Sequence, residues 1–375
     1  MKNEGRVAAT PETVKMLMEA GHTVFIEHGA GQGSHIQDED YERAGAILTN
    51  TLDVWVGSDI VMKVKEPLFN TKLGRHELDL LPRGGTLVGF LHPANHPDYV
   101  LKMAASDITS FSMDCIPRVE GSLPMDPLHS MSFIAGYKAA IMAADNLDMM
   151  VPFSKTPVAD LPGASALVVG LGTVGIQALK TLKGLGCQIK VVDVRPEIAD
   201  RAHELGAEFI NIPGADSSSP SLQSIRNTIS SVLPDVDIVI LSALVFGERA
   251  PVLLTTEMMK QLKSGSVVAD VSVDQGGNCE AVIPGEIAEV GGVKVIGILN
   301  LPGRLPVHST VLYARNTANF MIHLLKDNRV NLEDPIASGA LITHAGRIVH
   351  EGSRKAVEDY NQKSAAYVRL SQTAP

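Results

Sequence analysis

Short apolar runs of strand length alternate with longer amphipathic segments along most of the chain. The runs are rich in Val, Ile, Leu and Ala and lie at residues 23–27, 60–64, 86–91, 108–113, 166–169, 188–192, 237–243, 266–271 and 293–298. Segments with helical spacing separate many of them, most clearly at residues 97–106, 130–146, 176–186 and 310–326. Because buried strands that alternate with helices are typical of parallel sheets, this pattern predicts an α/β fold.

Two helical segments carry further signals. The first begins after Thr10, a residue type that caps helices, and Pro11 suits the first turn because its fixed φ already fits a helix. The segment at residues 130–146 is rich in Ala and Met and has no strong polar face. This composition predicts a buried helix that connects two domains.

A glycine-rich turn follows the strand at residues 166–169. The sequence there is Gly170-Leu171-Gly172-Thr173-Val174-Gly175, and the following helix and second strand complete a βαβ unit. In such a unit the first glycine allows a tight turn, the second lets the backbone approach a pyrophosphate, and the third lets the helix pack closely on the strand. The helix N-terminus offers free N–H groups to the phosphates. We therefore predict dinucleotide binding by Gly170, Gly172, Thr173, Val174 and Gly175.

Two charged residues after the second strand bear on the choice of dinucleotide. Asp193 can accept hydrogen bonds from a ribose 2′-OH, and its charge would repel the 2′-phosphate of NADP. Arg195 lies close to it in the sequence and is a residue type that accommodates this phosphate, which weakens the preference. We expect NAD as the cofactor, with Asp193 and Arg195 at its adenosine ribose.

Size and composition narrow the class of protein further. A chain of 375 residues predicts two domains, and its net charge of −10 argues against a nucleic-acid or anionic-membrane partner. Cys115, Cys187 and Cys279 have neither disulfide-framework nor zinc spacing, so we expect reduced thiols and no metal site. No apolar run is long enough to span a bilayer, and the first residues lack the apolar core of a signal peptide. These features predict a cytoplasmic protein.

A set of short motifs resembles the family of alanine dehydrogenases and nicotinamide nucleotide transhydrogenase α-subunits over nearly the whole chain. Besides the glycine-rich turn they are Asn3-Glu4-Gly5-Arg6-Val7-Ala8, Gly29-Ala30-Gly31, Met62-Lys63-Val64-Lys65-Glu66-Pro67, Phe90-Leu91-His92, Ala135-Gly136-Tyr137-Lys138, Asp274-Gln275-Gly276-Gly277 and Asn300-Leu301-Pro302-Gly303. The resemblance implies two Rossmann-like domains with parallel sheets. Residues 1–130 and 305–375 would form the substrate domain, and residues 131–304 would form an inserted NAD-binding domain, with the nicotinamide in the cleft between them.

The amino end departs from the family pattern. Relatives usually begin with a short strand before the motif that contains Arg6, whereas this chain starts almost at that motif. We therefore expect either a misassigned start or a substrate domain that lacks one strand.

The resemblance also implies a set of catalytic residues. Oxidation of an amino acid requires a cation for the carboxylate, a proton acceptor and an ordered water. Arg6 and Lys65 match the family's carboxylate-binding cations. His92 matches its proton-transfer histidine, and Asp274 matches the aspartate that orients water and substrate near the nicotinamide. A lone histidine at a strand end is more often a structural residue, but the joint presence of all four favours an L-amino-acid dehydrogenase that forms a 2-oxo acid.

Further cofactor contacts come from the resemblance alone. Ser132 would face the pyrophosphate or the nicotinamide ribose. Ala243 and Leu244 would line the nicotinamide site with their backbone, and Asn300 would contact the nicotinamide ribose. Because family members are oligomeric, we also expect a homo-oligomer.

Other motifs are more similar to the transhydrogenase branch, whose α subunit binds NAD(H) and passes hydride to NADP on a partner subunit. They include Ile116-Pro117-Arg118, Asn278-Cys279-Glu280, Val293-Lys294-Val295-Ile296-Gly297, Leu312-Tyr313-Ala314-Arg315-Asn316 and Leu332-Glu333-Asp334. That branch positions the nicotinamide with a loop containing Arg, Gln and Asp, and Arg118 and Asp126 match two of these positions. Leu123 stands at the glutamine position and cannot form the glutamine's hydrogen bond, and His129 replaces a nearby serine. A transhydrogenase subunit, acting with separate membrane and NADP-binding subunits, therefore remains an alternative, as does a non-catalytic NAD-binding protein.

Overall fold

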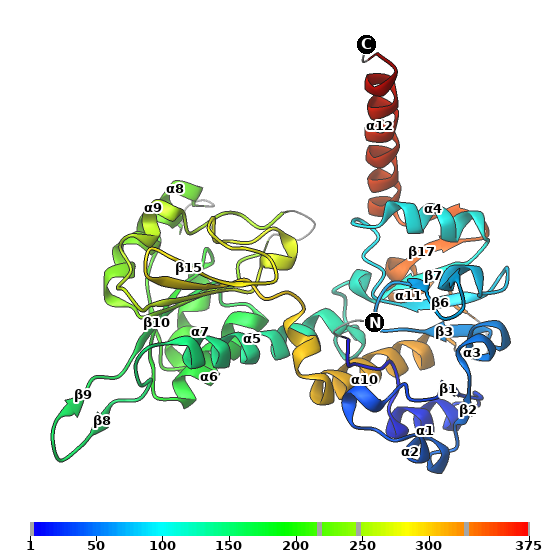
Figure 1. Cartoon of the computed structure of the whole chain (residues 1–375), viewed down its shortest axis with the longest axis horizontal. Helices are drawn as coiled ribbons and strands as arrows, with labels where there is room; N and C mark the ends of the chain where they lie inside the picture. Colours follow the sequence, from blue (N-terminus) through cyan, green and yellow to red (C-terminus); the bar gives the residue numbers. More distant parts are fainter. Residues whose placement is uncertain (1–3, 216–219, 245–248, 326–329, 374–375) are drawn as a thin grey trace. The chain divides into compact units, whose positions relative to one another are not determined.

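The computed structural model describes residues 4–215, 220–244, 249–325 and 330–373 (Figure 1). The chain divides into two compact units. Met1–Met131 and Pro306–Pro375 form one, which we call the terminal unit, and Ser132–Leu305 form the other, which we call the central unit. The assignment of the first to substrate and the second to NAD remains a prediction.

A seven-stranded sheet forms the middle of the central unit. Its order is β12-β11-β10-β13-β14-β16-β15, and every pair is parallel except β15 with β16. The strands are β10 (Ser165–Val169), β11 (Gln188–Val192), β12 (Glu208–Phe209), β13 (Ile238–Leu241), β14 (Val267–Asp270), β15 (Ile287–Val290) and β16 (Val293–Ile296). The order in which β10 has β11 and β12 on one side and β13 and β14 on the other is that of a dinucleotide-binding Rossmann sheet. The predicted α/β class with parallel sheets is therefore confirmed.

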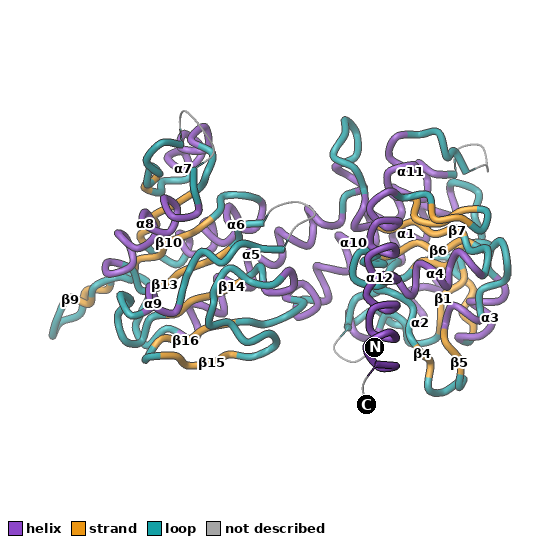
Figure 2. The backbone as a smooth tube through the Cα atoms, turned by 90° about the horizontal axis from the view of Figure 1, so that it is seen from above, coloured by secondary structure: helices purple, strands orange, loops and turns teal. Residues whose placement is uncertain are grey.

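Both faces of this sheet are covered, as Figure 2 shows for the helices around β10 and β13. The helices are α5 (Pro127–Asn146), α6 (Thr173–Gly184), α7 (Ala199–Glu204), α8 (Leu222–Val232) and α9 (Thr256–Met259). Ala166 and Val168 pack in one apolar cluster with residues of α5 and α6, whereas Leu167 and Val169 pack in another with residues of α8 and α9. Successive residues of β10 thus alternate between two buried faces, which explains its uninterrupted apolar sequence.

The segment at residues 152–163 contains a short antiparallel ladder of β8 (Ser154–Lys155) with β9 (Asp160–Leu161). Helix α5 is less buried than its composition predicts, because Phe133 and Tyr137 are exposed. A stripe of small residues, which includes Ala139, Ala140 and Ala143, provides the buried face of this helix instead.

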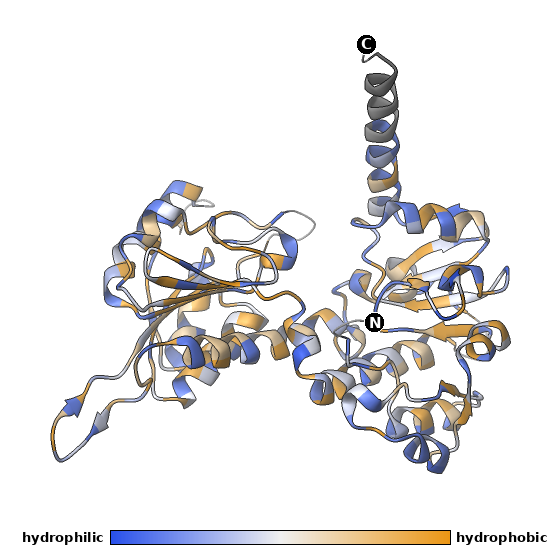
Figure 3. Ribbon diagram, in the orientation of Figure 1, coloured by the Kyte–Doolittle hydropathy of each residue, from blue (hydrophilic) through white to orange (hydrophobic). Residues whose placement is uncertain are grey.

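The terminal unit contains two separate larger sheets. One has the order β18-β17-β7-β6-β3, in which β3, β6 and β7 are parallel, and the other pairs β1 with β2 in parallel. The strands are β1 (Phe25–Glu27), β2 (Ile47–Thr49), β3 (Ile60–Met62), β6 (Thr86–Gly89), β7 (Thr109–Ser112), β17 (Leu341–His344) and β18 (Arg347–Ile348), and a small hairpin pairs β4 (Phe69–Asn70) with β5 (Arg75–His76). Figure 3 shows hydrophobic residues on several of these strands and many hydrophilic residues on the helices around them.

The helices of the terminal unit are α1 (Pro11–Glu19), α2 (Asp38–Arg43), α3 (Thr51–Gly57), α4 (Pro97–Ala105), α10 (Pro306–Leu324), α11 (Pro335–Ala340) and α12 (Glu351–Thr373). The predicted cap of α1 is confirmed: the Thr13 N–H donates to Thr10 Oγ1 at 3.2 Å, and the Thr10 N–H donates to Thr13 Oγ1 at 2.8 Å. Among the described residues, no helix combines the length and apolar character needed to cross a bilayer.

Candidate functional site

The predicted cofactor residues of the central unit follow the carboxyl ends of adjacent parallel strands. The glycine-rich turn follows β10, Asp193 and Arg195 follow β11, Ala243 and Leu244 follow β13, Asp274 follows β14, and Asn300 follows β16. Because these five strands are neighbours and run in the same direction, all of these segments lie along one edge of the sheet. Ser132 lies instead near the start of α5 and is half-buried.

The glycine-rich turn has the geometry that its sequence predicts. Gly170 has a φ of +88°, which favours glycine. A Cβ on Gly175 would lie 1.9 Å from the Gly170 carbonyl oxygen, so only glycine lets α6 approach the turn this closely. A Cβ on Gly172 would meet nothing within 4 Å, which leaves open space beside the backbone at the start of α6. The turn therefore fits a pyrophosphate approached by backbone N–H groups.

Asp193 is engaged in a closed set of hydrogen bonds. Its carboxylate accepts the Leu171 N–H at 2.7 Å and forms a bidentate pair with the Arg195 guanidinium, at 2.9 Å for both bonds. The Arg195 N–H also donates to it, at 3.0 Å. Burial raises the pKa of Asp193, but these donors and the charge of Arg195 outweigh burial, so the pKa lies below its ordinary value. A ribose hydroxyl would therefore have to replace Arg195, whose side chain is 47% exposed.

Asn278 connects three segments at the edge of the sheet where the predicted cofactor residues lie. The sequence did not indicate this structural role. Its side chain accepts the Ala243 N–H at 3.0 Å and donates to the carbonyl oxygens of Ala243 at 2.9 Å and Pro251 at 2.8 Å. Its own N–H donates to Asp270 at 2.7 Å. Since Ala243 is a predicted nicotinamide contact, Asn278 fixes the backbone at that position.

Asp270, at the end of β14, holds the loop that carries Asp274. Its carboxylate accepts N–H groups of Ser272, Asn278 and Cys279 at 2.9, 2.7 and 2.8 Å. Burial raises the pKa of Asp270 to about 6, although these three bonds act in the opposite direction. Beyond this anchor, the exposed Asp274 accepts the Asn300 N–H at 3.3 Å, so two predicted site residues are in contact.

In the terminal unit, Arg6 and Lys65 share a carboxylate. The Arg6 guanidinium binds Glu4 in a bidentate pair, with bonds of 2.8 and 2.7 Å, and Lys65 Nζ lies 4.0 Å from the same carboxylate. Burial raises the pKa of Glu4, but Arg6 outweighs it and lowers the pKa below its ordinary value. The Arg6 side chain is 3% exposed and that of Lys65 29% exposed. Both predicted cations are thus together, and Lys65 is the more accessible one.

His92 has an unusual backbone conformation. Its φ is +45°, in the left-handed region that non-glycine residues rarely adopt. The Asp114 carboxylate holds this turn because it accepts the N–H groups of Leu91 and His92, each at 3.1 Å. Asp114 Oδ2 also lies 3.9 Å from His92 Nδ1. A strained backbone at a histidine beside a carboxylate is a feature of functional sites.

Aromatic packing supports the His92 ring from behind. Phe90 stacks on it with ring centroids 5.9 Å apart, and Tyr313 of α10 packs on Phe90 at 5.1 Å. The Tyr313 hydroxyl donates to the Lys63 carbonyl oxygen at 2.6 Å. Burial raises the pKa of Asp114, and the nearby His92 acts against that rise. His92 itself is 40% exposed, so the ring is fixed on one side and accessible on the other.

Asp114 and Glu4 are candidate site residues that sequence reasoning did not assign. Glu4 belongs to the same motif as Arg6, but the ion pair between the two side chains follows only from the structure. Asp114 lies two residues beyond β7, next to the strand that leads to His92. The proximity of Asp114 to His92 could have been inferred, because the carboxyl ends of neighbouring parallel strands meet at one edge of a sheet.

The loop that matches the transhydrogenase motif lies on the terminal unit. Leu123 is 59% exposed and Arg118 is also exposed. Asp126 is buried and accepts the His129 N–H at 3.1 Å, near the start of α5. Asp126 is thus a buried residue that caps the start of α5, whereas Arg118 is a surface residue.

These features define the class of protein as an NAD-linked oxidoreductase: a Rossmann sheet with a dinucleotide-type turn, and a second unit with grouped acid, base and cationic side chains. Residues 1–135 match the family model described as "Alanine dehydrogenase/PNT, N-terminal domain", and residues 139–351 match "Alanine dehydrogenase/PNT, C-terminal domain". The chain belongs to this alanine dehydrogenase/PNT family, whose members bind NAD(H).

Similar proteins come from both branches of the family. NAD(P) transhydrogenase subunit alpha of Cereibacter sphaeroides is 34% identical over 366 residues, covering 92% of this chain and 69% of the relative. Alanine dehydrogenase of Bacillus subtilis is 34% identical over 361 residues, covering 93% and 90%. The crystal structure of transhydrogenase from Sinorhizobium meliloti superposes with a TM-score of 0.86 at 35% identity, covering 93% of this chain and 97% of that one. Similar identity to both branches leaves the choice to the chemistry of individual residues.

Proposed function

We propose that this protein is an NAD-dependent L-amino-acid dehydrogenase of the alanine dehydrogenase type. The observation that carries the proposal is His92, whose left-handed backbone is tied to Asp114 while its ring stays accessible. Backbone strain is concentrated at functional sites, and a proton acceptor needs a fixed and accessible ring. Asp114 beside Nδ1 would orient the imidazole and leave Nε2 for the substrate.

The reaction that fits these residues is oxidative deamination. An L-amino acid, NAD⁺ and water give the 2-oxo acid, ammonium, NADH and a proton. NAD, when bound at the glycine-rich turn, supplies the acceptor for the hydrogen on Cα. Neutral His92 accepts the proton that the reaction releases, and Asp274 orients the water that replaces the amino group.

The substrate carboxylate would bind mainly to Lys65. The Arg6 guanidinium already binds Glu4 in a bidentate pair, and Lys65 lies near the same carboxylate. The position of Glu4 therefore shows where a carboxylate can contact both cations. In the proposed complex, Glu4 and Arg6 position Lys65, which is the more accessible cation. This division modifies the expectation that Arg6 itself clamps the substrate.

The cofactor contacts remain part of the proposal. They are Gly170, Gly172, Thr173, Val174, Gly175, Asp193 and Arg195 for the phosphates and the adenosine ribose, and Ser132, Ala243, Leu244 and Asn300 for the nicotinamide half. A cytoplasmic homo-oligomer with a small amino-acid substrate completes the proposed description.

The second candidate is the NAD(H)-binding α subunit of a transhydrogenase that acts with membrane and NADP-binding subunits. The similarity to the Cereibacter sphaeroides protein over 366 residues favours it. The exposed Leu123 argues against it, because leucine cannot replace the hydrogen bonds of a glutamine.

An assay of the purified chain separates the two candidates. NAD⁺ reduction is measured with a panel of L-amino acids, and the reverse reaction with 2-oxo acids, ammonium and NADH. We expect turnover with at least one small amino acid. Lys65→Ala should raise KM far more than it lowers kcat, whereas Lys355→Ala, on an exposed position of α12, should change neither. Failure of every amino acid, with hydride transfer to an added NADP-binding subunit, would establish the second candidate instead.

A further inference from the structure

Glu66 differs from the other carboxylates near Lys65 and His92. The carboxylate of Asp114 accepts two backbone N–H groups, and that of Glu4 binds a guanidinium. Glu66 is half-buried, and its Oε2 atom is buried without a hydrogen-bond partner. No other carboxylate oxygen in the described part of the chain is in this situation. A buried acceptor without a partner costs free energy, so a ligand that satisfies it is favoured at this position.

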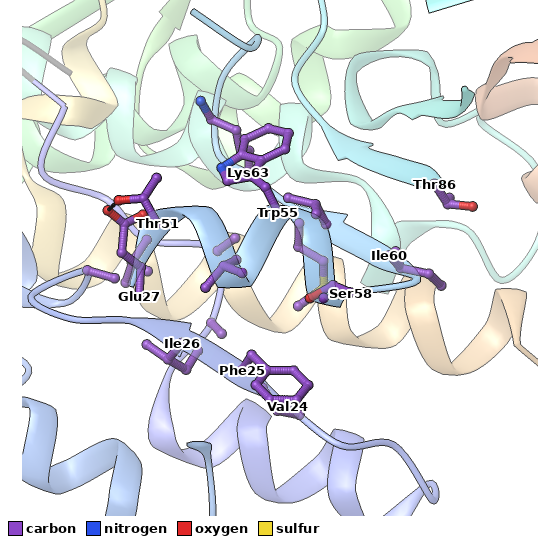
Figure 4. A pocket seen from close by; sticks show the side chains of 18 of the residues that line it. Val24, Phe25, Ile26, Glu27, Thr51, Trp55, Ser58, Ile60, Lys63 and Thr86 are labelled. Atoms are coloured by element: carbon purple, nitrogen blue, oxygen red, sulfur yellow. Dashed lines mark hydrogen bonds between the residues drawn. The ribbon is translucent and has the colours of Figure 1, made fainter. Parts of the chain in front are cut away.

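The two lysines closest to Glu66 in the sequence are engaged elsewhere. Lys63 forms an ion pair with Glu77, and its Nζ lies 5.7 Å from the centre of the Trp55 ring. Figure 4 shows the Lys63 side chain beside this ring. The Lys65 Nζ lies 4.0 Å from the carboxylate that the guanidinium binds. The negative charge of Glu66 is therefore available to a cationic group of a ligand.

The backbone places Glu66 beside the turn that carries His92. Strand β3 pairs with β6 in parallel, and beyond the last pair of this ladder the Phe90 N–H donates to the Val64 carbonyl oxygen at 3.1 Å. Glu66 and His92 each lie two residues further along these neighbouring segments. Because the two strands run in the same direction, both residues lie at the carboxyl edge of the sheet.

Charges of opposite sign are thus divided between two sides of this edge. A cavity of about 1360 Å³ in the terminal unit is lined by Glu4, Arg6 and Lys65, among others. Glu66 and His92 are not among the described residues that line it. The cations therefore belong to the cavity side, and Glu66 belongs to the side of His92. An α-amino acid carries its carboxylate and its ammonium group on one carbon, so it complements this division.

Aromatic side chains near Glu66 strengthen its attraction for a cation. Burial raises the pKa of Tyr99, and the charges of Asp98 and Glu66 raise it further, so the Glu66 carboxylate lies near this phenol. The Tyr99 ring stacks on that of His96, with centroids 5.2 Å apart. Because such surroundings screen charge less than water does, a carboxylate binds a cationic group more strongly there.

An ammonium group fits this position better than a metal ion does. Metal ions are held by several ligands together. No set of three His, Cys, Asp or Glu side chains within the described ranges could hold one. An ammonium group is itself a donor of three hydrogen bonds and needs only acceptors, of which the unpartnered Glu66 oxygen is one. The chemistry of the position therefore favours a primary ammonium group.

We propose that Glu66 binds the ammonium group of the amino-acid substrate while Lys65 binds its carboxylate, an inference that rests on the dehydrogenase activity proposed above. The same carboxylate binds the ammonium ion that the reaction releases. Glu66 thereby makes the site select amino acids over 2-hydroxy acids of the same shape, in which a neutral hydroxyl replaces the ammonium group. In the protein without substrate, the uncompensated charge of Glu66 lowers stability.

The test compares ligands that differ only in the group on Cα. L-alanine and L-lactate form one pair, glycine and glycolate the other, and each is titrated calorimetrically into the full chain saturated with NADH. Glu66→Gln keeps the shape of the side chain and removes its charge. Glu19→Gln, at an exposed position of α1, is the matched control. The same proteins are assayed for the KM of ammonium and of the 2-oxo acid, and for thermal unfolding.

The parent and Glu19→Gln should bind the amino acid of at least one pair more tightly than its hydroxy acid. Glu66→Gln should reduce this preference by roughly tenfold to a hundredfold, the usual contribution of a hydrogen bond to a charged group. It should raise the KM of ammonium by a similar factor and leave the KM of the 2-oxo acid within about twofold. Its unfolding temperature should not fall, because glutamine removes an uncompensated charge.

Two results would overturn the proposal: an unchanged preference in Glu66→Gln, or a parent protein that prefers the amino acid in neither pair. A clear fall in the unfolding temperature of Glu66→Gln would also overturn it, because the carboxylate would then hold a structural bond. A preference that depends on Glu66, without turnover of any amino acid, would support the binding site and reject the dehydrogenase. The two proposals can therefore fail separately.

Discussion

The central and terminal units both present parallel strands with candidate functional side chains beyond their carboxyl ends, but they differ in how the chain builds them. The central unit is one continuous segment with an unbroken seven-stranded sheet. The terminal unit combines both chain ends, and its parallel strands fall into two separate sheets. The proposed cofactor contacts thus come from one continuous segment, whereas the proposed proton chemistry is supported by both chain ends, because Tyr313 packs on the Phe90 ring that stacks with His92.

The difference extends to the polar groups that hold each site. In the central unit, Asp270 and Asn278 connect loops through direct hydrogen bonds of 3.0 Å or less. In the terminal unit, a single carboxylate, that of the half-buried Asp114, holds the strained turn at His92. Changes in the terminal unit should therefore affect turnover, and changes in the central unit should affect cofactor binding and stability.

The largest effect should come from His92. His92→Ala removes the proposed proton acceptor and should lower kcat by roughly two to four orders of magnitude, the usual contribution of a general base. NAD affinity should remain within about twofold, since the glycine-rich turn belongs to the central unit. Steady-state kinetics and calorimetric titration measure the two quantities. His96→Ala in the same loop is the control and should keep nearly full turnover; similar losses in both variants would count against a specific role for His92.

The next largest effect should come from Gly175. Its Cβ would lie 1.9 Å from the Gly170 carbonyl oxygen, so Gly175→Ala must displace α6 from the turn. We expect a loss of roughly 1–3 kcal/mol in the free energy of unfolding and a weaker affinity for NAD. Gly184→Ala in the same helix meets nothing within 4 Å and should be neutral or stabilising. Unfolding curves and NAD titration check this pair, and unaltered NAD binding in Gly175→Ala would exclude the turn as the pyrophosphate site.

Asp270 predicts a pH dependence of stability in the central unit. Its pKa in the folded protein is about 6, above the ordinary value of 3.8, so the folded state binds the proton more tightly. This contribution is fully present below the ordinary pKa and is lost as the pH rises through about 6. Between pH 4 and pH 7 the change should amount to roughly 2–3 kcal/mol.

The measurement is urea unfolding at several pH values for the parent protein and Asp270→Asn. The variant should lack this part of the pH dependence, although it is less stable at neutral pH because an amide accepts fewer N–H bonds. Asp200→Asn, at an exposed position of α7, should follow the parent. Parallel pH profiles for the parent and Asp270→Asn would show that Asp270 does not titrate in this range.

The smallest effect concerns the choice between NAD and NADP. The Arg195 cation is bound to Asp193 and offsets the charge that would repel a 2′-phosphate. Arg195→Ala should therefore strengthen the preference for NAD by about tenfold. Arg201→Ala, which breaks an exposed pair with Glu204, serves as the control. A stronger affinity for NADP in Arg195→Ala would reverse the roles assigned to these two charges.

Features encoded within one short segment were predictable from the sequence. The cap at Thr10, the turn at Gly170 and the close packing at Gly175 are confirmed, because each depends on neighbours within a few residues. The α/β class was predictable for the same reason, since each strand and helix carries its own apolar pattern.

Features that depend on distant contacts were not predictable. Asp114 binds the His92 backbone across 22 residues, and Asn278 binds Ala243 across 35. No local pattern distinguishes these two side chains from ordinary loop residues. The pairing of Asp193 with Arg195 was missed for another reason, because proximity in sequence did not reveal that both carboxylate oxygens are engaged.

The most direct test of the proposed dehydrogenase follows the hydrogen on the substrate Cα. The protein is incubated with NAD⁺ and L-amino acids deuterated at Cα, beginning with alanine, and the products are analysed by mass spectrometry. The account predicts that deuterium appears on the reduced nicotinamide, with 2-oxo acid and ammonium formed in equal amounts. Absence of deuterium transfer from every amino acid, from a protein that still binds NAD⁺, would contradict it.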